Sequence, residues 1–290
     1  MTKVDVQSTV SSGGGDVAEP IALLETDGYC VLRGHHDGDR VDAALDVVER
    51  LWADVDGRVT NDLPEMAKDP IVWNLQNKSY ALLELLFDSP ALESILMHFL
   101  NDRWYRAIAA DRPNYIMRAY VARSGLTPLP LHIDSFVPYV SDHVISLQCT
   151  IVLEDMSADN GCTLVVPGSH RSGTYVEQSA LADAVPVEAR AGDVVLWDSR
   201  LWHGASENAA GRTRWALIAT FTRWWVKQAF NITGKLPADI YDRLTDSQRA
   251  ILGFCSIPHD DEYEGVVMQQ GYDALPSSPA GRRRDDEPSG

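Results

Sequence analysis

Between residues 114 and 221 the chain is a succession of short β-type runs, and this pattern decides the fold class. The runs are rich in β-branched and aromatic residues, and turn signals that contain Gly, Pro, Asn or Asp accompany them. The runs read YIMRAYVA, HVISLQCTIVLED, CTLVVPG, DVVLWDS and RWALIATFTRWW, and the turn signals read RSG, SADNG, PGSH, AGD and ENAAGR. Many short strands with few helices between them indicate a sandwich or jelly roll rather than a doubly wound parallel sheet.

Helical patterns flank this β region on both sides. In the first third of the chain, apolar residues recur at i, i+3, i+4 and i+7, which predicts a one-faced helix that carries Val41, Ala44, Leu45, Val48, Leu51 and Trp52. Ser89 before Pro90 predicts another helix start, and Thr245 with Gln248 forms a capping-box pattern. We therefore expect a mainly β fold with flanking helices around a jelly-roll core.

The domain organisation follows from the same patterns. We expect a single domain over residues 19–276, made of a helical N-terminal part at about 39–100, a jelly-roll core at about 114–225 and a C-terminal helical lid at about 226–276. The polar, Gly- and Ser-rich segment 1–18 and the tail 277–290 are expected to be disordered.

The formal net charge of −17 and the sequence pI of about 4.7 make the chain strongly acidic. Such a charge disfavours phosphate backbones and anionic membranes, so we expect no nucleic acid and no membrane as partner. The first residues lack the apolar core of a signal peptide, and the four cysteines lie far apart without a CxxC pair. We expect a cytoplasmic protein, a monomer or a homodimer, whose partner is a small-molecule substrate.

The stretch LPLHIDSF places His132 and Asp134 two residues apart. In a β-strand such residues point to the same face, where an imidazole and a carboxylate could bind one metal ion. His203 follows the predicted strand in GDVVLWDSRLWHGASEN, and distant strands of an antiparallel jelly roll become neighbours. The three side chains could therefore meet, with His143 as the alternative ligand. Two His and one carboxylate leave about three octahedral positions free, as in non-heme Fe(II) oxygenases.

An arginine follows the distal histidine at the start of the next apparent strand, RWALIATF. The free positions of such a metal ion can take O2 and a bidentate 2-oxo acid, whose far carboxylate then needs a cation. Arginine offers a planar pair of donors that suits a carboxylate. Arg214 is the preferred candidate and Arg212 the alternative, because Gly211 and Thr213 have the character of a turn and its exit.

HID, NGCTLVVPGSH, GDVVLWDSRLWHGASEN and RTRWALIATF together resemble the phytanoyl-CoA dioxygenase family, from about residue 27 to residue 225. Members are Fe(II)- and 2-oxoglutarate-dependent oxygenases on a double-stranded β-helix. The resemblance implies Fe(II), with 2-oxoglutarate and O2 as co-substrates. It implies iron ligands at His132, Asp134 and His203, a carboxylate clamp at Arg214, and residues lining that pocket at Thr150, Thr163 and Gln148. Many members carry a polar residue just before the HxD motif, where this chain has Pro128–Leu131, which leaves that role for another part of the chain.

The function expected from this resemblance is oxidation, above all hydroxylation, of an unactivated C–H bond of a small molecule in specialised metabolism. Succinate and CO2 would be released. Asp134 argues against halogenation, because related halogenases carry Gly or Ala there. Two alternatives stay open, a cupin-like metal-dependent isomerase or epimerase and a non-catalytic binding protein of the same fold. Dependence on 2-oxoglutarate separates the first expectation from both.

Candidate substrate residues come from three segments. The amide-rich stretch WNLQNKS offers carbonyl and NH2 groups that could read a polar substrate, or could simply hold a loop. Alternate positions of YIMRAYVA share one face, and the aromatics beyond the last strand could close over a ligand or anchor the segment to the core. The residues concerned are Asn74, Gln76, Asn77, Arg118, Tyr120 and Trp224.

Overall fold

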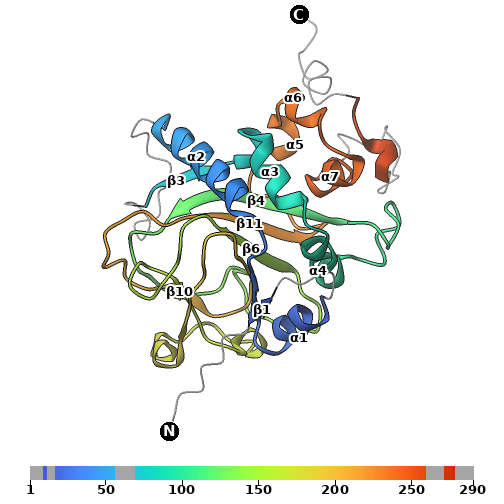
Figure 1. Cartoon of the computed structure of the whole chain (residues 1–290). Helices are drawn as coiled ribbons and strands as arrows, with labels where there is room; N and C mark the ends of the chain where they lie inside the picture. The colour runs from blue at the N-terminus through green and yellow to red at the C-terminus, as the bar shows by residue number, and fades with distance from the viewer. Residues whose placement is uncertain (1–8, 12–16, 56–68, 259–270, 278–290) are drawn as a thin grey trace, which may run out of the picture. The chain divides into compact units, whose positions relative to one another are not determined.

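A computed structural model of the chain describes residues 9–11, 17–55, 69–258 and 271–277 (Figure 1). The chain divides into two compact units. The first unit comprises Met1–Trp73 and Val121–Ala219, and the second comprises Asn74–Tyr120 and Thr220–Gly290. The chain passes from one unit to the other within β4 (Tyr115–Ser124) and within β11 (Trp215–Arg223).

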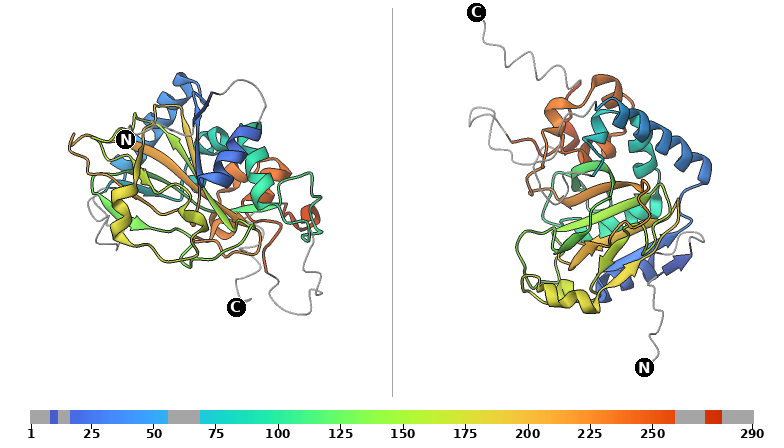
Figure 2. Two further views of the ribbon diagram at one scale, coloured as in Figure 1. Left: turned by 90° about the horizontal axis from the view of Figure 1, so that it is seen from below. Right: turned by 90° about the vertical axis from the view of Figure 1, so that its left-hand side faces the viewer.

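The strands form one sheet of seven strands and one of four. The larger sheet has the order β1-β2-β9-β6-β11-β4-β3, and the smaller has the order β5-β10-β7-β8 (Figures 1 and 2). β2 pairs antiparallel with β9, β9 with β6, and β3 with β4, whereas β1 runs parallel to β2. Besides β4 and β11, the strands are β1 (Thr9–Ser11), β2 (Tyr29–Arg33), β3 (Ile71–Trp73), β5 (Leu129–His132), β6 (Ser146–Val152), β7 (Thr163–Val165), β8 (Val185–Val187), β9 (Val194–Asp198) and β10 (His203–Ala205).

Alternation along the strands builds the core of the first unit. Val31 of β2 and Val195 of β9 lie in one buried cluster with Val165 of β7 and Val187 of β8, so the two sheets share an apolar interior. Two packed sheets of short, mostly antiparallel strands, with helices around them, confirm the predicted fold class, a mainly β fold with a jelly-roll core.

The longer helix of the first unit is α2 (Gly38–Ala53), and α1 is Ala18–Thr26. α2 buries Val41, Ala44 and Val48, which lie on the predicted apolar face. Two 3-10 turns, η3 (Ser169–Arg171) and η4 (Gln178–Asp183), complete this unit.

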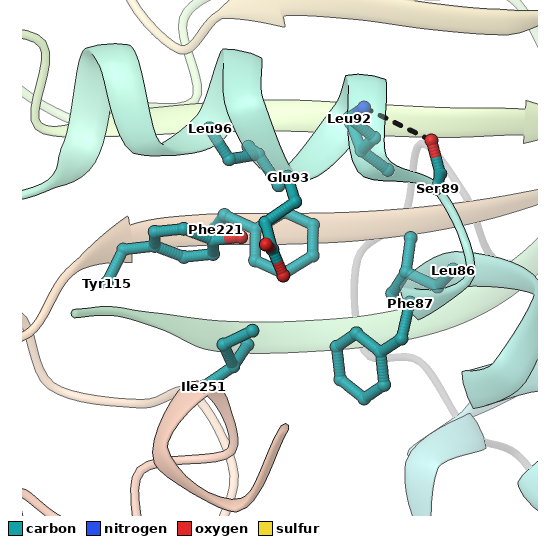
Figure 3. A pocket seen from close by; sticks show the side chains of 9 residues that line it. All are labelled: Leu86, Phe87, Ser89, Leu92, Glu93, Leu96, Tyr115, Phe221 and Ile251. Carbon is teal, nitrogen blue, oxygen red and sulfur yellow. Dashed lines mark hydrogen bonds between the residues drawn. The ribbon is translucent and has the colours of Figure 1, made fainter. Parts of the chain in front are cut away.

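The second unit is mainly helical. The Ser89 hydroxyl caps α4 by accepting the backbone N–H of Leu92 at 3.1 Å, and Thr245 and Gln248 form a complete capping box at α7, so both predicted helix starts are confirmed. Figure 3 shows the Ser89 cap beside a small, mainly apolar pocket between α4, Tyr115, Phe221 and Ile251. The helices are α3 (Tyr80–Phe87), α4 (Pro90–Leu100), α5 (Ile232–Lys235), α6 (Ala238–Tyr241) and α7 (Asp246–Ile251), with 3-10 turns η2 (Leu75–Asn77) and η6 (Gly271–Ala274).

The two tails expected to be disordered, residues 1–18 and 277–290, lie mostly outside the described residues. Within the first of them Thr9–Ser11 forms β1. Among the residues that the structure describes, no helix has the length and apolar character needed to cross a membrane.

Candidate metal centre

Two strands of the smaller sheet bring two histidines together. β5 and β10 pair antiparallel with His132 directly opposite His203, and the centroids of the two imidazole rings lie 4.2 Å apart. The chain turns just after β5, where the backbone N–H groups of Asp134 and Ser135 both donate to the carbonyl oxygen of Ser199, at 2.8 and 2.9 Å. This turn places the Asp134 carboxylate beside the two rings.

The three side chains converge as the sequence predicted. Oδ1 of Asp134 lies 3.7 Å from Nε2 of His132, and Oδ2 lies 3.3 Å from Nε2 of His203. All three potential ligand atoms lie within 4.8 Å of one another, the only such group of three or more His, Cys, Asp or Glu side chains among the described residues. His143, the alternative ligand, is exposed and outside this group.

Backbone carbonyls set the tautomer of both imidazoles. Nδ1 of His132 lies 3.0 Å from the carbonyl oxygen of Pro130, and Nδ1 of His203 lies 2.9 Å from that of Leu201. Because a carbonyl can only accept, each Nδ1 carries the proton and donates it, and each Nε2 keeps its lone pair. Both lone pairs are therefore on the nitrogens next to Asp134, as metal binding requires.

Trp197 supports the carboxylate from β9. Its indole Nε1 donates to Oδ2 of Asp134 at 3.4 Å, and its ring centroid lies 5.3 Å from that of His203. Nothing in the sequence distinguishes this tryptophan from the others as a hydrogen-bond donor to a metal ligand. The hydrogen bond between Trp197 and Asp134 depends on the tertiary packing of β9 against the turn after β5.

The pKa values of the three groups depend on burial and on one another. Burial opposes ionisation of Asp134, but the imidazoles of His203 and His132 and the indole N–H of Trp197 together outweigh it and lower the pKa of the carboxyl group to about 2. Burial likewise opposes protonation of His203, whereas the charge of Asp134 raises its pKa above the ordinary value. Burial, followed by the nearby His203, lowers the pKa of His132. Two imidazole nitrogens and one ionised carboxylate on one face are the donor set that Fe(II) takes in non-heme oxygenases, so the residues fit that ion.

Arg214 is a buried cation. Its side chain is enclosed, Nη1 lies 2.9 Å from the Sδ atom of Met156, and its backbone N–H donates to the hydroxyl of Ser124 at 2.7 Å. In the described part of the chain no carboxylate lies within ion-pair distance of it, and its Nε atom is buried without an acceptor. Burial, followed by the charge of Arg123, lowers its pKa to about 10. A guanidinium in this state needs an anion. The alternative, Arg212, is exposed.

Thr150, Gln148 and Thr163, which were assigned to the co-substrate pocket, face the interior between the sheets. In β6, Gln148, Thr150 and Val152 occupy alternate positions and so share one face, and Val152 belongs to the interior cluster. The cross-strand partners of Gln148 and Thr150 in β9, Trp197 and Val195, belong to the same cluster. Thr163 stands two residues before Val165 of the same cluster. The hydroxyl of Thr150 is buried and has no partner among the described residues, so it is free to bond a ligand oxygen.

The site opens to solvent at its first histidine. The side chain of His132 is 40% exposed and that of Asp134 26%, against 7% for His203. Exposed apolar side chains lie on two segments, one directly after Asp134 and one around η4. The second segment contacts β5, because the side chain of Gln178 hydrogen-bonds to the backbone N–H and carbonyl groups of Leu131. These exposed apolar side chains are Phe136, Val137, Val140, Tyr175 and Leu181, and we call them the apolar rim.

A buried ion pair between Arg200 and Asp198 contacts the segment between Asp134 and β6 and holds it in place. Arg200 forms a bidentate pair with Asp198, at 2.9 and 2.6 Å, and donates from Nη1 to the carbonyl oxygen of Ser141 at 2.7 Å. Its guanidinium also lies over the ring of Tyr139, 4.6 Å from the centroid. Phe136, in the middle of this segment, has a φ of +63°, a conformation that bulky residues rarely adopt.

The six predicted substrate residues all belong to the second unit, whereas the metal ligands belong to the first. The Tyr120 hydroxyl donates to the carbonyl of Leu82 at 2.8 Å, and the backbone carbonyl of Arg118 accepts from Ala229. Trp224 stacks on Tyr105 with ring centroids 4.5 Å apart. A substrate role for these three remains a prediction.

The amide-rich stretch of the second unit forms η2 and its N-terminal flank. Asn74 has a φ of +58°, and its Oδ1 accepts from Nε2 of the fully buried Gln76 at 3.2 Å. Oε1 of Gln76 and Oδ1 of Asn77 are buried without a partner among the described residues. Hydrogen bonds within the loop therefore satisfy only some of its side-chain amide groups. A substrate role for these residues also remains a prediction.

Comparison with known proteins gives one family. The model of the family described as "Phytanoyl-CoA dioxygenase (PhyH)" matches residues 24–216, about two thirds of the chain. The chain is 33% identical over 133 residues to the uncharacterized protein Rv1501 of Mycobacterium tuberculosis, which covers 45% of this chain and 49% of that protein. It is 30% identical over 161 residues to dioxygenase af480 of Aspergillus fumigatus, covering 53% and 52%. The chain thus spans about half the length of these relatives.

Solved structures share the fold at low sequence identity. The epimerase SnoN in complex with Fe3+, alpha ketoglutarate and nogalamycin RO has a TM-score of 0.56 and 21% identity, over 71% of this chain and 83% of that one. EctD from S. alaskensis with 2-oxoglutarate and 5-hydroxyectoine has a TM-score of 0.57 and 21% identity, over 71% and 76%. At this level of identity, the likeness supports the jelly-roll fold and does not by itself assign an activity.

Proposed function

This chain belongs to the phytanoyl-CoA dioxygenase (PhyH) family, and we propose that it is an Fe(II)- and 2-oxoglutarate-dependent dioxygenase that hydroxylates an unactivated C–H bond of a small molecule. One observation carries the proposal. His132, Asp134 and His203 converge on one face, and a buried arginine without a carboxylate partner, Arg214, lies in the same unit. The first group suits Fe(II) and the second suits the distal carboxylate of a 2-oxo acid.

The roles of the residues follow from their surroundings. His132 and His203 would bind iron through Nε2, since Nδ1 of each donates to a backbone carbonyl. Asp134 would be the anionic ligand, oriented by Trp197. Bound Fe(II) would supply the oxidative chemistry, in which O2 and 2-oxoglutarate are consumed and succinate and CO2 are released.

Arg214 would bind the distal carboxylate of 2-oxoglutarate. Since the guanidinium is enclosed, the ion pair would form away from bulk water, where a carboxylate and an arginine attract each other more strongly. The interior position and partnerless hydroxyl of Thr150 support a further hydrogen bond to the co-substrate, and Thr163 and Gln148 would line the same pocket.

The apolar rim supports a substrate with substantial apolar surface. Five exposed large apolar side chains near an open metal site are a common mark of ligand contact. A role in specialised metabolism is supported by the relatives, since SnoN is described as coming from nogalamycin biosynthesis. We further propose that the protein is cytoplasmic and acts as a monomer or homodimer.

A second candidate outcome is epimerisation that also depends on 2-oxoglutarate. It is favoured by the likeness to SnoN, which is described as an alpha ketoglutarate dependent epimerase. Both outcomes use the same metal ligands and the same arginine. Hydroxylation places the second oxygen atom of O2 in the substrate, whereas epimerisation needs an external two-electron reductant, such as ascorbate, that converts this atom to water. An isomerase that needs no 2-oxoglutarate would leave Arg214 without a function, and so would a non-catalytic binding protein.

Turnover assays test this proposal. The iron-loaded protein would be incubated with 2-oxoglutarate and a panel of polycyclic natural products, with succinate release and product mass as readouts. Hydroxylation adds one oxygen atom to the substrate, whereas epimerisation leaves its mass unchanged, and in both cases succinate appears only in the presence of O2. Conversion of a substrate without consumption of 2-oxoglutarate would indicate an isomerase instead, and tight binding without conversion would indicate a binding protein.

A further inference from the structure

A second arginine lies next to Arg214. A Cβ atom built on Gly125 would lie 2.5 Å from Nη2 of Arg214 and 4.0 Å from Nη2 of Arg123. The two Nη2 atoms are therefore at most about 6.5 Å apart, the sum of those two distances. Two guanidinium groups this close repel each other unless anions lie between or beside them.

Only one of the two cations has its own counter-ion. Nε and Nη2 of Arg123 donate to Oδ2 of Asp69 at 2.9 and 2.5 Å. The other oxygen, Oδ1, accepts the backbone N–H groups of Leu126 and Thr127 at 2.8 and 3.0 Å. The Asp69 carboxylate is fully buried and engaged by four donors, so its hydrogen-bonding capacity is used without Arg214.

The two arginines thus have one ion-paired carboxylate between them, that of Asp69 with Arg123, and the charge of Arg214 has no ion-pair partner among the described residues. Glu154, the other acid that acts on Arg214, instead accepts the backbone N–H of Trp215 at 2.7 Å. Burial, followed by the charge of Arg123, lowers the pKa of Arg214, as expected of two cations this close. An enclosed guanidinium without a counter-ion is costly, so a further anion beside the two arginines would stabilise them.

We propose that Arg123 is a second binding residue for the distal carboxylate of 2-oxoglutarate, and that Asp69 is the positioning residue that holds it there. This inference rests on the proposed function. Asp69 fixes the guanidinium from one side, which leaves the rest of its donors for the co-substrate.

The test must separate two effects of Arg123, its proposed binding of 2-oxoglutarate and its ion pair with the buried Asp69 carboxylate. Arg123→Gln alone would leave the buried Asp69 carboxylate without a cation, so the protein could unfold. We would therefore compare the wild-type protein with two variants, Asp69→Asn and Asp69→Asn/Arg123→Gln. The single variant keeps both arginines, whereas the double variant removes Arg123 without leaving a buried Asp69 carboxylate unpaired. Arg190→Gln, on an exposed arginine of the same unit, is the matched control.

The readout is the dissociation constant of 2-oxoglutarate on the anaerobic Fe(II)-loaded protein, followed by the visible absorption of the chelated 2-oxo acid. Pyruvate, which has no distal carboxylate, is measured alongside it. We expect the double variant to bind 2-oxoglutarate at least about tenfold more weakly than the wild-type protein, with less than about a threefold change for pyruvate, and Asp69→Asn to bind 2-oxoglutarate no more tightly than the wild type. Arg190→Gln should leave both constants unchanged.

Equal affinity of the double variant and the wild-type protein for 2-oxoglutarate, with thermal denaturation showing that both are folded, would overturn the inference. An equal loss for 2-oxoglutarate and pyruvate would also overturn it, because Arg123 would then act on the metal end of the co-substrate. Failure of the wild-type protein to bind 2-oxoglutarate is a different result, which refutes the proposed function itself.

Discussion

His203 and His132 are direct cross-strand partners of β10 and β5, and their ring centroids lie 4.2 Å apart. The register of one short strand pair thus sets the distance between two of the three potential metal ligands. Because side chains alternate along a strand, a slip of one residue would turn His203 to the opposite face. The candidate metal centre therefore depends on how closely β10 approaches β5.

Gly204 allows that approach. A Cβ atom at this position would lie 2.6 Å from the backbone carbonyl oxygen of Leu129 and 3.2 Å from that of Pro130, and neither atom can move freely. We expect Gly204→Ala to push β10 away from β5, to cost about 1–3 kcal/mol of stability, and to weaken Fe(II) binding at least about tenfold. Calorimetric titration with metal and chemical denaturation would measure both effects.

Gly38→Ala is the matched control for that substitution. A Cβ atom at Gly38 meets nothing within 4 Å, and the residue begins α2. Its effect on stability should be neutral or favourable by up to about 1 kcal/mol, with metal affinity unchanged. If Gly204→Ala behaved like this control, the close approach of the two strands would be unnecessary for the site.

Trp197 should tune the metal centre without being a ligand. Trp197→Phe keeps most of the buried ring but removes the Nε1 donor to Asp134. We expect Fe(II) affinity to fall about 10- to 100-fold, as is usual when a hydrogen bond to a ligand is lost, while the fold is kept. Metal titration beside circular dichroism would check this. Unchanged affinity in the folded variant would mean that the 3.4 Å contact does not orient the carboxylate.

The Asp198–Arg200 pair should matter for stability. Both side chains are buried, so Arg200→Ala leaves the Asp198 carboxylate without its cation. We expect a loss of about 3–5 kcal/mol in the free energy of unfolding, measured by chemical denaturation. Replacing both members, as in Asp198→Leu/Arg200→Met, should cost less than the single change. A double variant as unstable as the single one would refute the idea that the lone buried charge is the cause.

Acid should destabilise the protein in part through His170. Burial lowers the pKa of this imidazole, and the nearby charges of Arg200 and Arg171 act in the same direction, whereas Asp198 and the carbonyl of Glu25 oppose them. The folded protein therefore keeps His170 neutral at a pH where the unfolded chain already binds a proton. Stability should fall as the pH drops below about 6.5, the ordinary histidine pKa, and further through the pKa of the folded state.

The corresponding experiment is a series of denaturation curves between pH 7 and pH 5. His170→Gln should make the free energy of unfolding less dependent on pH. Some dependence should remain in His170→Gln, because burial lowers the pKa of His35 too. An unaltered slope in His170→Gln would show that another group takes up the proton.

Local patterns in the sequence were sufficient to predict the fold class and the convergence of His132, Asp134 and His203. The antiparallel topology expected of many short strands brings His203 beside His132, whereas Asp134 lies in the turn after β5 and reaches the site from there, not through the strand alternation that we expected. Arg214 could be preferred over Arg212 from the turn residues around them, and the structure buries the first and exposes the second.

Several features could not be predicted, because they depend on contacts between residues distant in sequence. Asp69 and Arg123 are 54 positions apart, and no spacing rule links a residue at the entry to β3 with one near the end of β4. The donor role of Trp197 depends on how β9 lies behind the turn at Asp134. The positive φ of Phe136 is equally unexpected, since local preferences oppose it.

The central claim is that His132, Asp134 and His203 bind Fe(II) and that Arg214 binds the 2-oxoglutarate chelated to it. Its test is an anaerobic titration of the protein with Fe(II) and then 2-oxoglutarate, which should produce a weak visible absorption band near ~500 nm. The band should be absent in His203→Ala and should need far more 2-oxoglutarate in Arg214→Ala. A folded, iron-loaded wild-type protein that gives no band at saturating 2-oxoglutarate would contradict the claim.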